Sequence, residues 1–444
     1  MKNVGRSLFA AGLNLLFFMS LSQTATGQDV LPPRGEPLNA DQCVAIALKI
    51  HPALAAGQAS VEALRARVEQ SLSAYYPQVA FNAGYSASTF NFVAVGGAIR
   101  QPTYNWTFLD IASAGPTATV TLYDFGRTAN NVRISRENVK ASQEDLATTR
   151  QTVTLNVRTA YYNVLQQQFL IDVAQDTVNQ TQLHLDQAQG FYQAGTQPKI
   201  YVTNAEVALA NAQLALIQTK NNFSVARATL NNAMGLRQDL NFAIVKDIEV
   251  QPKVVPLQEI MNSAYERRPE IQKVKAQQRA QEAAINLARA GYYPVLSGNA
   301  QFLERMHHPS WDPWIWDATV GATMSIPLFS GFLTPNQVSE ARAVLLNLQA
   351  QEESTKQNIR LEAEQAYLAL TVAIQQIEVT QKTVQQAKEN YELASGRYQV
   401  GVGSPLEITD AEVSLANARA NYIQAVYNYK RAQAQIEKAM GINR

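Results

Sequence analysis

The chain has 444 residues, of which 46% are hydrophobic and 16% are charged, and its formal net charge is +1. This length is sufficient for two or three ordinary domains. The nearly neutral charge argues against nucleic acid or an acidic membrane surface as the main partner, because such partners are bound by strongly basic faces.

The amino terminus has the pattern of a secretory signal peptide over residues 1–27. Lys2 and Arg6 precede a mostly apolar run, 8–19, and small residues lie directly before Gln28. Such segments are cleaved during export, so we expect the mature chain to start near Gln28. No later stretch holds about 18 uninterrupted apolar residues, and a helical membrane span in the mature chain is therefore not expected.

Cys43 is the only cysteine, which excludes an intrachain disulfide. Its neighbours, 40–42, lack the apolar context of a bacterial lipid-attachment site. We therefore expect Cys43 to be a small buried residue rather than a reactive or lipidated one.

The mature chain contains an internal duplication. The segment AEVALANA at 205–212 returns as AEVSLANA at 411–418, a spacing of 206. Farther upstream the spacing is 217, since 76–77 corresponds to 293–294, so the first copy carries an 11-residue excess. A repeat of this length indicates that one ordered set of elements occurs twice. We expect a first repeat at 28–235, a connecting equatorial segment at 236–256 and a second repeat at 257–444.

Each repeat begins with a predicted β-hairpin, at about 77–125 and about 294–329. Apolar side chains alternate with small or polar ones, as at Val79 and Phe81 in the first hairpin, and the alternation of the second continues to Leu328. This pattern is typical of membrane strands with one lipid-facing and one wet side, although the edge of a soluble sandwich gives similar alternation.

Aromatic and histidine side chains are predicted in the hairpin loops. Tryptophans in such loops would form an aromatic girdle at the outer membrane interface. The four tryptophans expected there are Trp106, Trp311, Trp314 and Trp316. The only histidine pair, His307-His308, is expected in an exposed loop, and we do not expect it to bind a metal.

A long helix is predicted after each hairpin. Proline is absent between Pro116 and Pro198 and between Pro335 and Pro405, so nothing interrupts helical hydrogen bonding there. Apolar residues recur every seven positions, a helical period. They are Val157, Val164, Ile171, Val178, Leu185 and Tyr192 in the first copy and Ala363, Leu370, Ile377, Val384, Tyr391 and Tyr398 in the second. A helix of roughly 65 residues would be ~100 Å long, too long for a compact domain.

A return helix follows each long helix, and the helical parts extend over about 127–234 and about 332–440. Their seams tend to alternate larger with small residues, as in Leu209 and Ala212. Small residues at the contact let neighbouring helices approach closely. The helices alone would also fit a coiled-coil rod, and the hairpins argue against that interpretation.

The predicted strands require an oligomer. Four strands cannot close a membrane barrel, and an open sheet edge in lipid leaves backbone groups unpaired at a cost of several kcal/mol each. Two copies would give a barrel of about eight strands, whose interior is nearly filled by side chains. Three copies would give a barrel of about twelve strands and leave a channel. A trimer is therefore the smallest symmetric oligomer whose closed barrel leaves an open channel.

The order of these elements resembles that of TolC-like outer-membrane efflux proteins. The strand exits at 122–126 and 327–331 and the turns at 192–195 and 398–401 also resemble the family, over essentially the whole mature chain. The resemblance implies a mainly α fold with membrane β. A duplicated β-hairpin plus long-helix hairpin would build a trimeric 12-stranded β-barrel, continued by a periplasmic α-helical barrel.

The resemblance also implies a function and partners. The chain would be the outer-membrane duct of a tripartite efflux or type I secretion system in a Gram-negative bacterium, extending into the periplasm. It would form a homotrimer and bind a periplasmic adaptor (membrane fusion) protein and, beyond it, an inner-membrane pump. Small-molecule efflux and protein secretion both stay open, because the pump selects the cargo.

The family's adaptor-docking tips correspond to the two helical turns of this chain. The matching residues are Gly195 and Thr196 in the first turn and Gly401, Val402, Gly403 and Ser404 in the second. The glycines are equally explained as helix C-caps. Both interpretations can hold, because a docking tip must first turn.

In the family, acidic residues just after the second turn ring the narrow periplasmic entrance, and the matching residues here are Glu407 and Asp410. Carboxylates from three chains around a constriction would favour cations and repel one another. The alternative for Glu407 is structural, since 404–407 has the serine, the first-position proline and the glutamate of a helix capping box.

One departure from the family concerns closure. Some members hold the entrance shut with an arginine bonded to an aspartate of the neighbouring turn, whereas this chain has Gly403 and Tyr201 at those positions. Without that ionic latch, we expect closure through packing of the tips by Tyr398 and Tyr201.

No catalytic or cofactor motif is recognised. The chain lacks HExxH, GxSxG, a phosphate-binding glycine loop and a metal-spaced Cys/His set. We therefore expect no enzymatic activity and no cofactor, so that energy for transport comes from a partner. The competing interpretation is a periplasmic structural coiled-coil or adaptor protein, which would be soluble after signal removal and would need no hairpins.

Overall fold

The computed structural model describes residues 37–90, 107–236, 242–245, 250, 252–308 and 315–442. The signal peptide and three of the four tryptophans, Trp106, Trp311 and Trp314, lie outside them. In chain order the elements are α1 (Ala40–Ile50), α2 (Pro52–Leu72), η1 (Ser73–Tyr75), β1 (Gln78–Phe90), β2 (Thr107–Tyr123), α3 (Arg127–Gln193), α4 (Lys199–Ala233), α5 (Leu257–Arg267), α6 (Pro269–Arg289), η2 (Ala290–Tyr292), β3 (Val295–His308), β4 (Ile315–Ser325), α7 (Leu333–Gln399) and α8 (Pro405–Ala439). The predicted mainly helical chain with an antiparallel sheet is confirmed.

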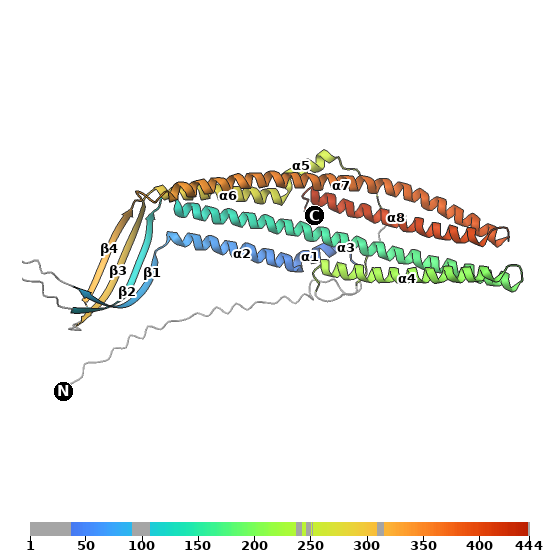
Figure 1. Cartoon of the computed structure of the whole chain (residues 1–444), viewed down its shortest axis with the longest axis horizontal. Coiled ribbons are helices and arrows are strands. Elements are labelled where there is room, and N and C mark those ends of the chain that lie inside the picture. Colours follow the sequence, from blue (N-terminus) through green and yellow to red (C-terminus); the bar gives the residue numbers. More distant parts are fainter. Residues whose placement is uncertain are drawn as a thin grey trace, which may run out of the picture.

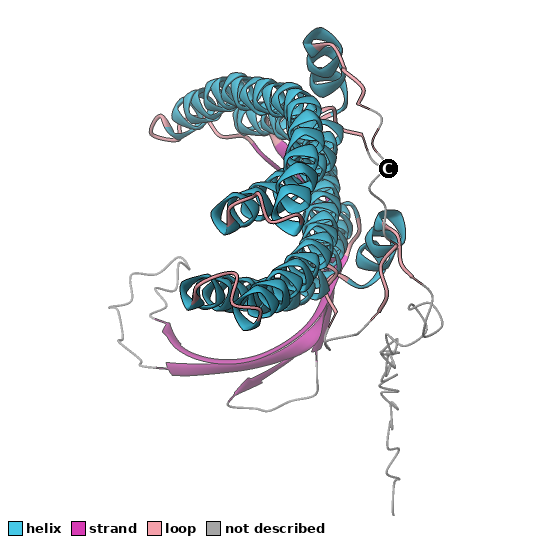
Figure 2. Ribbon diagram, turned by 90° about the vertical axis from the view of Figure 1, so that its right-hand side faces the viewer, coloured by secondary structure: helices cyan, strands magenta, loops and turns pink. Residues whose placement is uncertain are grey.

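The helices form one curved wall of four columns (Figure 1). The helices α3 and α7, each of 67 residues, are two of these columns. Along α3, α2 and α4 follow one another on one side, and α6 and α8 follow one another between α3 and α7. Seen along its length the wall is a crescent, with α1 and α5 on its convex side (Figure 2). The α2–α4 column and α7 are therefore the two outer edges of the wall.

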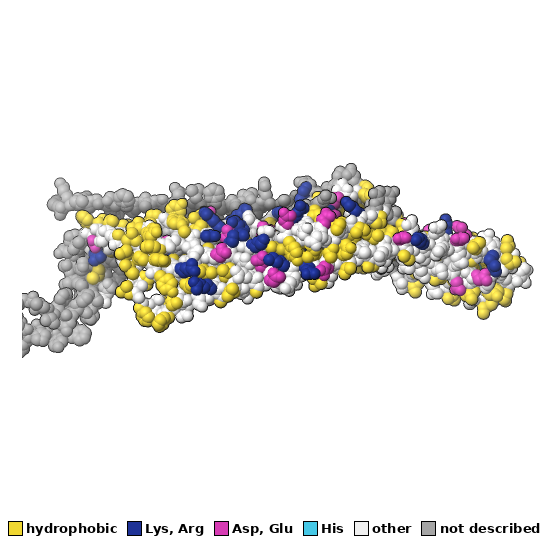
Figure 3. All heavy atoms as spheres, turned by 90° about the horizontal axis from the view of Figure 1, so that it is seen from above, with side chains coloured by type: hydrophobic (Ala, Val, Ile, Leu, Met, Phe, Trp, Pro, Cys, Tyr) yellow, Lys and Arg dark blue, Asp and Glu magenta, His cyan; other side chains and the backbone are white. Residues whose placement is uncertain are grey.

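The four strands form one antiparallel sheet at one end of the wall, in the order β1-β2-β3-β4 (Figure 1). The pairing of β2 with β3 joins the two repeats and leaves β1 and β4 as the sheet edges. Alternate side chains are apolar and exposed, including Val79, Phe81 and Val320, of which Val320 is 87% exposed. Hydrophobic side chains also gather at this end in the space-filling view (Figure 3).

Three details of the predicted hairpins are wrong. The strand β4 ends at Ser325, so the alternation to Leu328 continues beyond it. Trp316 lies in β4, paired with Glu304, and not in a loop. His307-His308 ends β3, opposite β2, and also lies outside a loop. In each case pairing with the neighbouring strand sets where the strand begins and ends. The alternation of side chains indicates only which residues share a face of the sheet.

The connections from strand to long helix are alike in the two repeats. The Asp124 carboxylate accepts hydrogen bonds from the backbone N–H of Gly126 (3.0 Å) and of Thr128 (2.7 Å) and so caps α3. Gly126 has φ of +86°, and Phe332, its counterpart before α7, has φ of +63°. The left-handed conformation turns the chain from the sheet into the wall in both repeats.

Two clusters of buried side chains stabilise the middle of the wall. One joins α1, α3, α4 and α8, and the other joins α5, α7 and α8. The predicted heptad positions supply their centres, with Val157 and Val164 in the first and Ala363 and Leu370 in the second. Cys43 is buried in the first cluster as predicted, and burial raises the pKa of its thiol to about 12. A thiol with so high a pKa is a poor nucleophile.

Arg268 marks the junction of two helices in one column, where α8 ends and α6 begins. Its buried guanidinium donates hydrogen bonds to Glu270 (2.9 Å), to Glu362 of α7 (2.7 Å) and to the carbonyl of Lys438 at the end of α8 (3.4 Å). Two carboxylates and a carbonyl compensate the charge that burial would otherwise leave unpaired. One side chain therefore joins α6, α7 and α8 at mid-length.

The helix α4 is apolar for a helix on the edge of the wall. Among the described residues it is the one helix that by itself has the length and composition to cross a membrane, and α1 with α2 has them only as a bent pair. It nevertheless packs along α3, at the end of the molecule opposite the sheet (Figure 1). Most of its apolar stretch is exposed in the single chain.

Candidate functional site

The two helical turns lie together at the end of the wall opposite the sheet (Figure 1). In the α3–α4 turn, Gly195 has φ of +71°, and its N–H donates to the carbonyl of Tyr192 (3.0 Å). The N–H and the hydroxyl of Thr196 both donate to the carbonyl of Phe191, at 3.0 and 2.9 Å. These bonds satisfy the last carbonyls of α3, as a glycine C-cap does.

The α7–α8 turn repeats this geometry with one addition. Gly401 has φ of +77°, and the N–H groups of Val402 (3.1 Å) and Gly403 (2.9 Å) both donate to the carbonyl of Arg397. A Cβ at Gly403 would lie 2.8 Å from the backbone nitrogen of Tyr398, so only glycine fits there. The second turn is thereby folded tightly against the end of α7, with Val402 exposed.

The predicted capping box of α8 forms in part. The Ser404 hydroxyl accepts a hydrogen bond from the N–H of Leu406 (3.2 Å) and so caps the helix. The Glu407 carboxylate instead lies 3.6 Å from the Arg397 guanidinium across the turn. Both Glu407 and Asp410 are exposed, and a spacing of three places them on one face of α8. Both carboxylates thus lie on the surface at the tip end of the wall, and Arg397 partly compensates the charge of Glu407.

Tyr398 lies inside the tip rather than on its surface. Its side chain is 1% exposed, and its ring meets those of Phe191 and His184 edge-on, at centroid distances of 5.6 and 5.0 Å. Its hydroxyl donates to the side-chain oxygen of Gln197 (3.5 Å), and burial raises its pKa. Tyr398 therefore fastens α7 to the α3–α4 turn within one chain, while Tyr201 is half-buried in the first turn of α4.

Two buried titratable groups near the tip were missed by the sequence analysis. Glu412 of α8 is 2% exposed, its Oε2 has no hydrogen-bond partner among the described residues, and burial raises its pKa to about 7. His184 of α3 is also buried, with Nδ1 likewise unpartnered there, and burial lowers its pKa. No local signal predicts this burial, because the repeat equivalent of Glu412, Glu206, is exposed.

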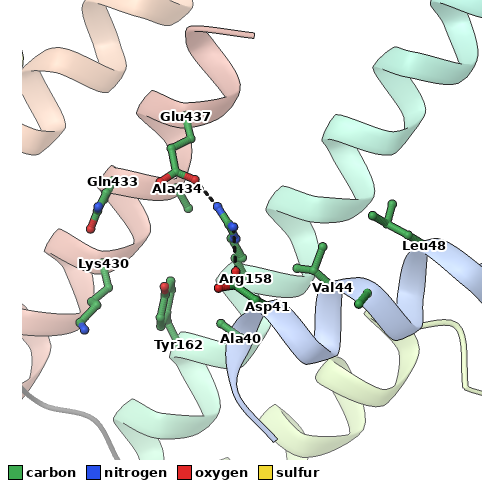
Figure 4. Close-up of a pocket in the computed structure, with 11 residues that line it drawn as sticks. Ala40, Asp41, Val44, Leu48, Arg158, Tyr162, Lys430, Gln433, Ala434 and Glu437 are labelled. Atoms are coloured by element: carbon green, nitrogen blue, oxygen red, sulfur yellow. Dashed lines mark hydrogen bonds and ion pairs between the residues drawn. The ribbon is translucent and has the colours of Figure 1, made fainter. Parts of the chain in front are cut away.

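A pocket of about 470 Å³ lies at mid-length, between α1, α3 and α8 (Figure 4). Arg158 points between two carboxylates there, pairing with Asp41 of α1 (2.9 Å) and with Glu437 of α8. Burial alone would lower the pKa of Arg158, but the charges of Glu437 and Asp41 outweigh it and raise that pKa. Arg158 thus ties α1 and α8 to α3, far from the tips.

The described residues contain no group of three or more His, Cys, Asp or Glu side chains that could hold a metal ion. The tips therefore offer turns, exposed apolar and small side chains, and carboxylates. Exposed apolar side chains are suited to contacting another protein, and the exposed carboxylates give the tip a local negative charge.

Comparison with known proteins gives low identity over long alignments. The outer membrane protein TolC of Escherichia coli is 22% identical over 299 residues, which is 65% of this chain and 61% of TolC. The protein CyaE of Bordetella pertussis is 23% identical over 390 residues, covering 86% of this chain and 79% of CyaE. The chain thus aligns with about three fifths of TolC's length.

The fold is shared with solved channels, and the family match covers most of the chain. The structure of the Campylobacter jejuni CmeC outer membrane channel superposes with a TM-score of 0.77 at 18% identity, covering 90% of this chain and 85% of that one. Residues 44–236 and 260–442, one segment in each repeat, match the outer membrane efflux protein family. The chain therefore belongs to the outer membrane efflux protein family.

Proposed function

We propose that three copies of this chain form an outer-membrane duct of a tripartite efflux or type I secretion system. The duct conducts substrates passively from an inner-membrane pump, through the periplasm, to the exterior. One observation carries the proposal: an open sheet with exposed apolar side chains is built onto one end of a helical wall ~100 Å long. In this arrangement each repeat, 28–235 and 257–444, supplies one hairpin and one helical pair, joined by the equatorial segment 236–256.

The sheet supports the trimer. Its edges, β1 and β4, are antiparallel to each other because the order alternates, so β4 of one copy can continue the ladder of β1 in the next. Three four-stranded sheets would close a 12-stranded barrel with a channel and leave no unpaired backbone in lipid. The apolar face that includes Val79 and Val320 would then meet the outer-membrane lipid.

The opposite end supports docking to a periplasmic adaptor protein. The two turns project together, and the exposed side chains of the second are apolar, at Val400, Val402 and Leu406. Apolar and small residues at a rigid turn suit a partner that presents a complementary helical tip. We place the docking surface on Gly195 and Thr196 of the first turn and on the second turn from Gly401 to Ser404.

The entrance of the duct would be ringed by Glu407 and Asp410 from three copies. Asp410 is exposed and Glu407 is paired with Arg397, so Asp410 is the stronger contributor to the charge of the ring. Closure would depend on packing of the tips, in which Tyr398 is buried and Tyr201 adjoins it on α4.

Fractionation of cells that express the full-length chain tests this function. We expect a detergent-extracted trimer in the outer membrane, and we expect deletion of the gene to sensitise cells to exported compounds or to abolish secretion of a protein. A soluble periplasmic monomer would instead indicate a structural coiled-coil or adaptor protein.

A further inference from the structure

A groove of about 850 Å³ lies between α2 and α3, in the part of the wall nearest the sheet. The basic residues that line it are Arg65, Arg133, Arg136 and Lys140. Arg65 pairs with Glu62 (2.6 Å), and Lys140 pairs with Glu137 (2.7 Å). Within the part of the chain that the structure describes, Arg133 and Arg136 form no ion pair and no side-chain hydrogen bond. The groove therefore holds two exposed guanidinium groups without a counterion there.

The groove keeps a positive charge when its internal ion pairs are counted. Glu137 is shared between Lys140 and Arg279 of α6 (2.8 Å), so one carboxylate compensates two cations. Glu69 is the other acidic residue of the lining besides Glu62 and Glu137. With Arg279 included, five cationic side chains stand against three carboxylates, which leaves a net charge of +2. A groove of this charge favours an anionic ligand.

The groove opens on the convex side of the wall. Arg158 of α3 pairs with Asp41 of α1, and α1 lies on the convex side (Figure 2). Glu137 comes three heptads before Arg158, and both residues also pair with the column that α6 and α8 form. They therefore share one face of α3, and Arg133 lies one turn from Glu137 on that face. In the proposed duct the convex side is the outer surface of the tube.

Aromatic side chains mark the boundary of the hydrocarbon at the junction of sheet and wall. The exposed rings at this junction come from both repeats and are Tyr76, Tyr123, Phe125, Tyr292 and Tyr293. Such rings gather where the hydrocarbon meets the lipid headgroups. Each headgroup layer of a bilayer is roughly 5–8 Å thick. On the outer surface of the duct, this layer would extend over the first turns of α3.

Arg133 and Arg136 lie within reach of that layer. Their backbone positions are ~9 and ~14 Å beyond Arg127, where α3 begins. Long side chains on a helix lean toward its N-terminus, which for α3 is the end at the sheet (Figure 1). Both guanidinium groups are therefore displaced toward the headgroups, as in side chains that snorkel to a membrane interface. Lys140 lies ~20 Å along α3, which is too far to reach them.

We propose that Arg133 and Arg136 bind the phosphate of an anionic phospholipid in the periplasmic leaflet of the outer membrane. Guanidinium groups bind phosphate through paired hydrogen bonds, and a spacing of three residues lets both side chains contact one headgroup. This inference rests on the proposed duct, because it takes the convex side of the wall as the side that meets lipid. Each copy then binds a headgroup directly below the barrel.

The second repeat does not provide an equal site. By the spacing of 206, Arg136 corresponds to Arg342, but Arg133 corresponds to Ser339. On the facing helix the spacing is 217, so Arg65 corresponds to Glu282. Two basic side chains are thus replaced by a neutral one and an acidic one. The proposed trimer therefore carries three such sites, one on each copy.

Lipid retention by the full-length protein tests the site. We would reconstitute the protein into vesicles of equal parts phosphatidylglycerol and phosphatidylcholine, extract it with mild detergent and count the co-purified lipids by mass spectrometry. The test variant combines Arg133→Gln with Arg136→Gln. The matched control is Arg150→Gln, two heptads after Arg136 on the same face of α3 and ~21 Å farther from the sheet. All three arginines are exposed, so the substitutions leave the core intact.

We expect the native protein and Arg150→Gln to retain phosphatidylglycerol over phosphatidylcholine at least threefold, and the double variant to lose this preference. Equal preference in the native protein and the double variant overturns the site. An inserted trimer without any preference also overturns it and leaves the proposed duct standing.

Two further outcomes also overturn the site. If an excess of inorganic phosphate abolishes the preference, and chloride at the same ionic strength does not, the arginines hold a soluble anion and not a headgroup. A chain that does not insert into the vesicles removes the proposed function, and this inference with it.

Discussion

Glu206 and Glu412 show how one residue of a repeated segment acquires two different environments. Both are the second residue of AEVxLANA, yet Glu412 is buried and Glu206 is exposed. The reason is position in the wall, because α8 lies between α3 and α7 whereas α4 has α3 on one side only. Burial disfavours the charged form of a carboxyl group and raises the pKa of Glu412 to about 7.

The pH dependence of stability should therefore change in Glu412→Gln. The folded-state pKa of Glu412 is raised from 4.5 to about 7, so its contribution to stability is complete below pH 4.5 and is lost as the pH rises through 7. Glutamine cannot ionise and should escape this loss. We expect the variant and the native protein to melt alike at pH 4.5, and the variant to be more stable at pH 8 by up to about 3 kcal/mol.

Thermal unfolding of the detergent-solubilised protein between pH 4.5 and 8 measures this difference. Glu206→Gln is the matched control, since it makes the same change at the equivalent exposed position. Its melting temperature should follow that of the native protein at every pH. If both variants shifted equally, burial of Glu412 would not be the cause.

Gly403 is the residue of the tip least open to substitution. A methyl group there would lie 2.8 Å from the backbone nitrogen of Tyr398 and 2.9 Å from the carbonyl carbon of Arg397, and backbone atoms cannot move aside cheaply. Gly403→Ala should therefore open the α7–α8 turn at a cost of about 1–3 kcal/mol. Limited digestion with trypsin should cleave after Arg397 faster in the variant than in the native protein.

Gly396 provides the comparison, because it lies in the last turns of α7, where a methyl group would meet no other atom within 4 Å. Gly396→Ala should stabilise the helix by about 1 kcal/mol and slow the same cleavage. Equal cleavage of the two variants would show that the close approach at Gly403 does not constrain the turn.

At the scale of elements, successive side chains of each strand point to opposite faces of the sheet, so that one face is apolar and the other is small or polar. Val320 of β4 is 87% exposed in the single chain, and its neighbour Thr319 points to the other side of the sheet. With the Val320 side in lipid, Val320→Asp places a carboxylate there, whereas Thr319→Asp places it on the wet side. We expect Val320→Asp to reduce the folded trimer in outer membranes at least tenfold and Thr319→Asp to be tolerated.

Heat-modifiable migration of the trimer on gels measures this effect. Equal loss in both variants would mean that the two sides of the sheet are not distinguished by lipid. The exposed apolar side of the sheet would then need another explanation, such as packing against a soluble partner.

At the scale of the whole molecule, the structure places its two working ends ~100 Å apart on continuous helices. Two arginines at mid-length, the half-buried Arg158 and the buried Arg268, tie neighbouring columns together. The sheet end is suited to lipid and the tip end to protein contact and charge. The two ends are therefore joined by one continuous helical wall.

Cation selectivity should report the charge at the tip end. If Asp410 from three copies rings the entrance, Asp410→Asn removes three negative charges from a narrow opening. We expect the ratio of cation to anion permeability in planar bilayers to fall severalfold. Glu407→Gln should have a smaller effect, because Arg397 partly compensates that carboxylate. Unchanged selectivity in Asp410→Asn would remove Asp410 from the entrance.

Much of the helical fold could be predicted from particular residues. The proline-free stretches and the heptads centred on Val157 and Ala363 predicted α3 and α7, because proline and period act locally along one helix. The same patterns did not predict α2 and α6. These helices are shorter, and each shares its column with a helix from another part of the chain, α2 with α4 and α6 with α8. Strand ends were also missed, as at Trp316, because a partner strand sets them.

The sequence by itself determined the duplication, the long helices, the alternation of the strands and the glycines of the two turns, since each depends on the covalent order of neighbouring residues. Only the tertiary structure decided which column lies between two others. That placement buries Glu412, exposes Glu206 and leaves α4 and α7 as open edges. The physical reason is that burial depends on helices brought together from distant parts of the chain. Two nearly identical segments therefore do not indicate which of them is buried.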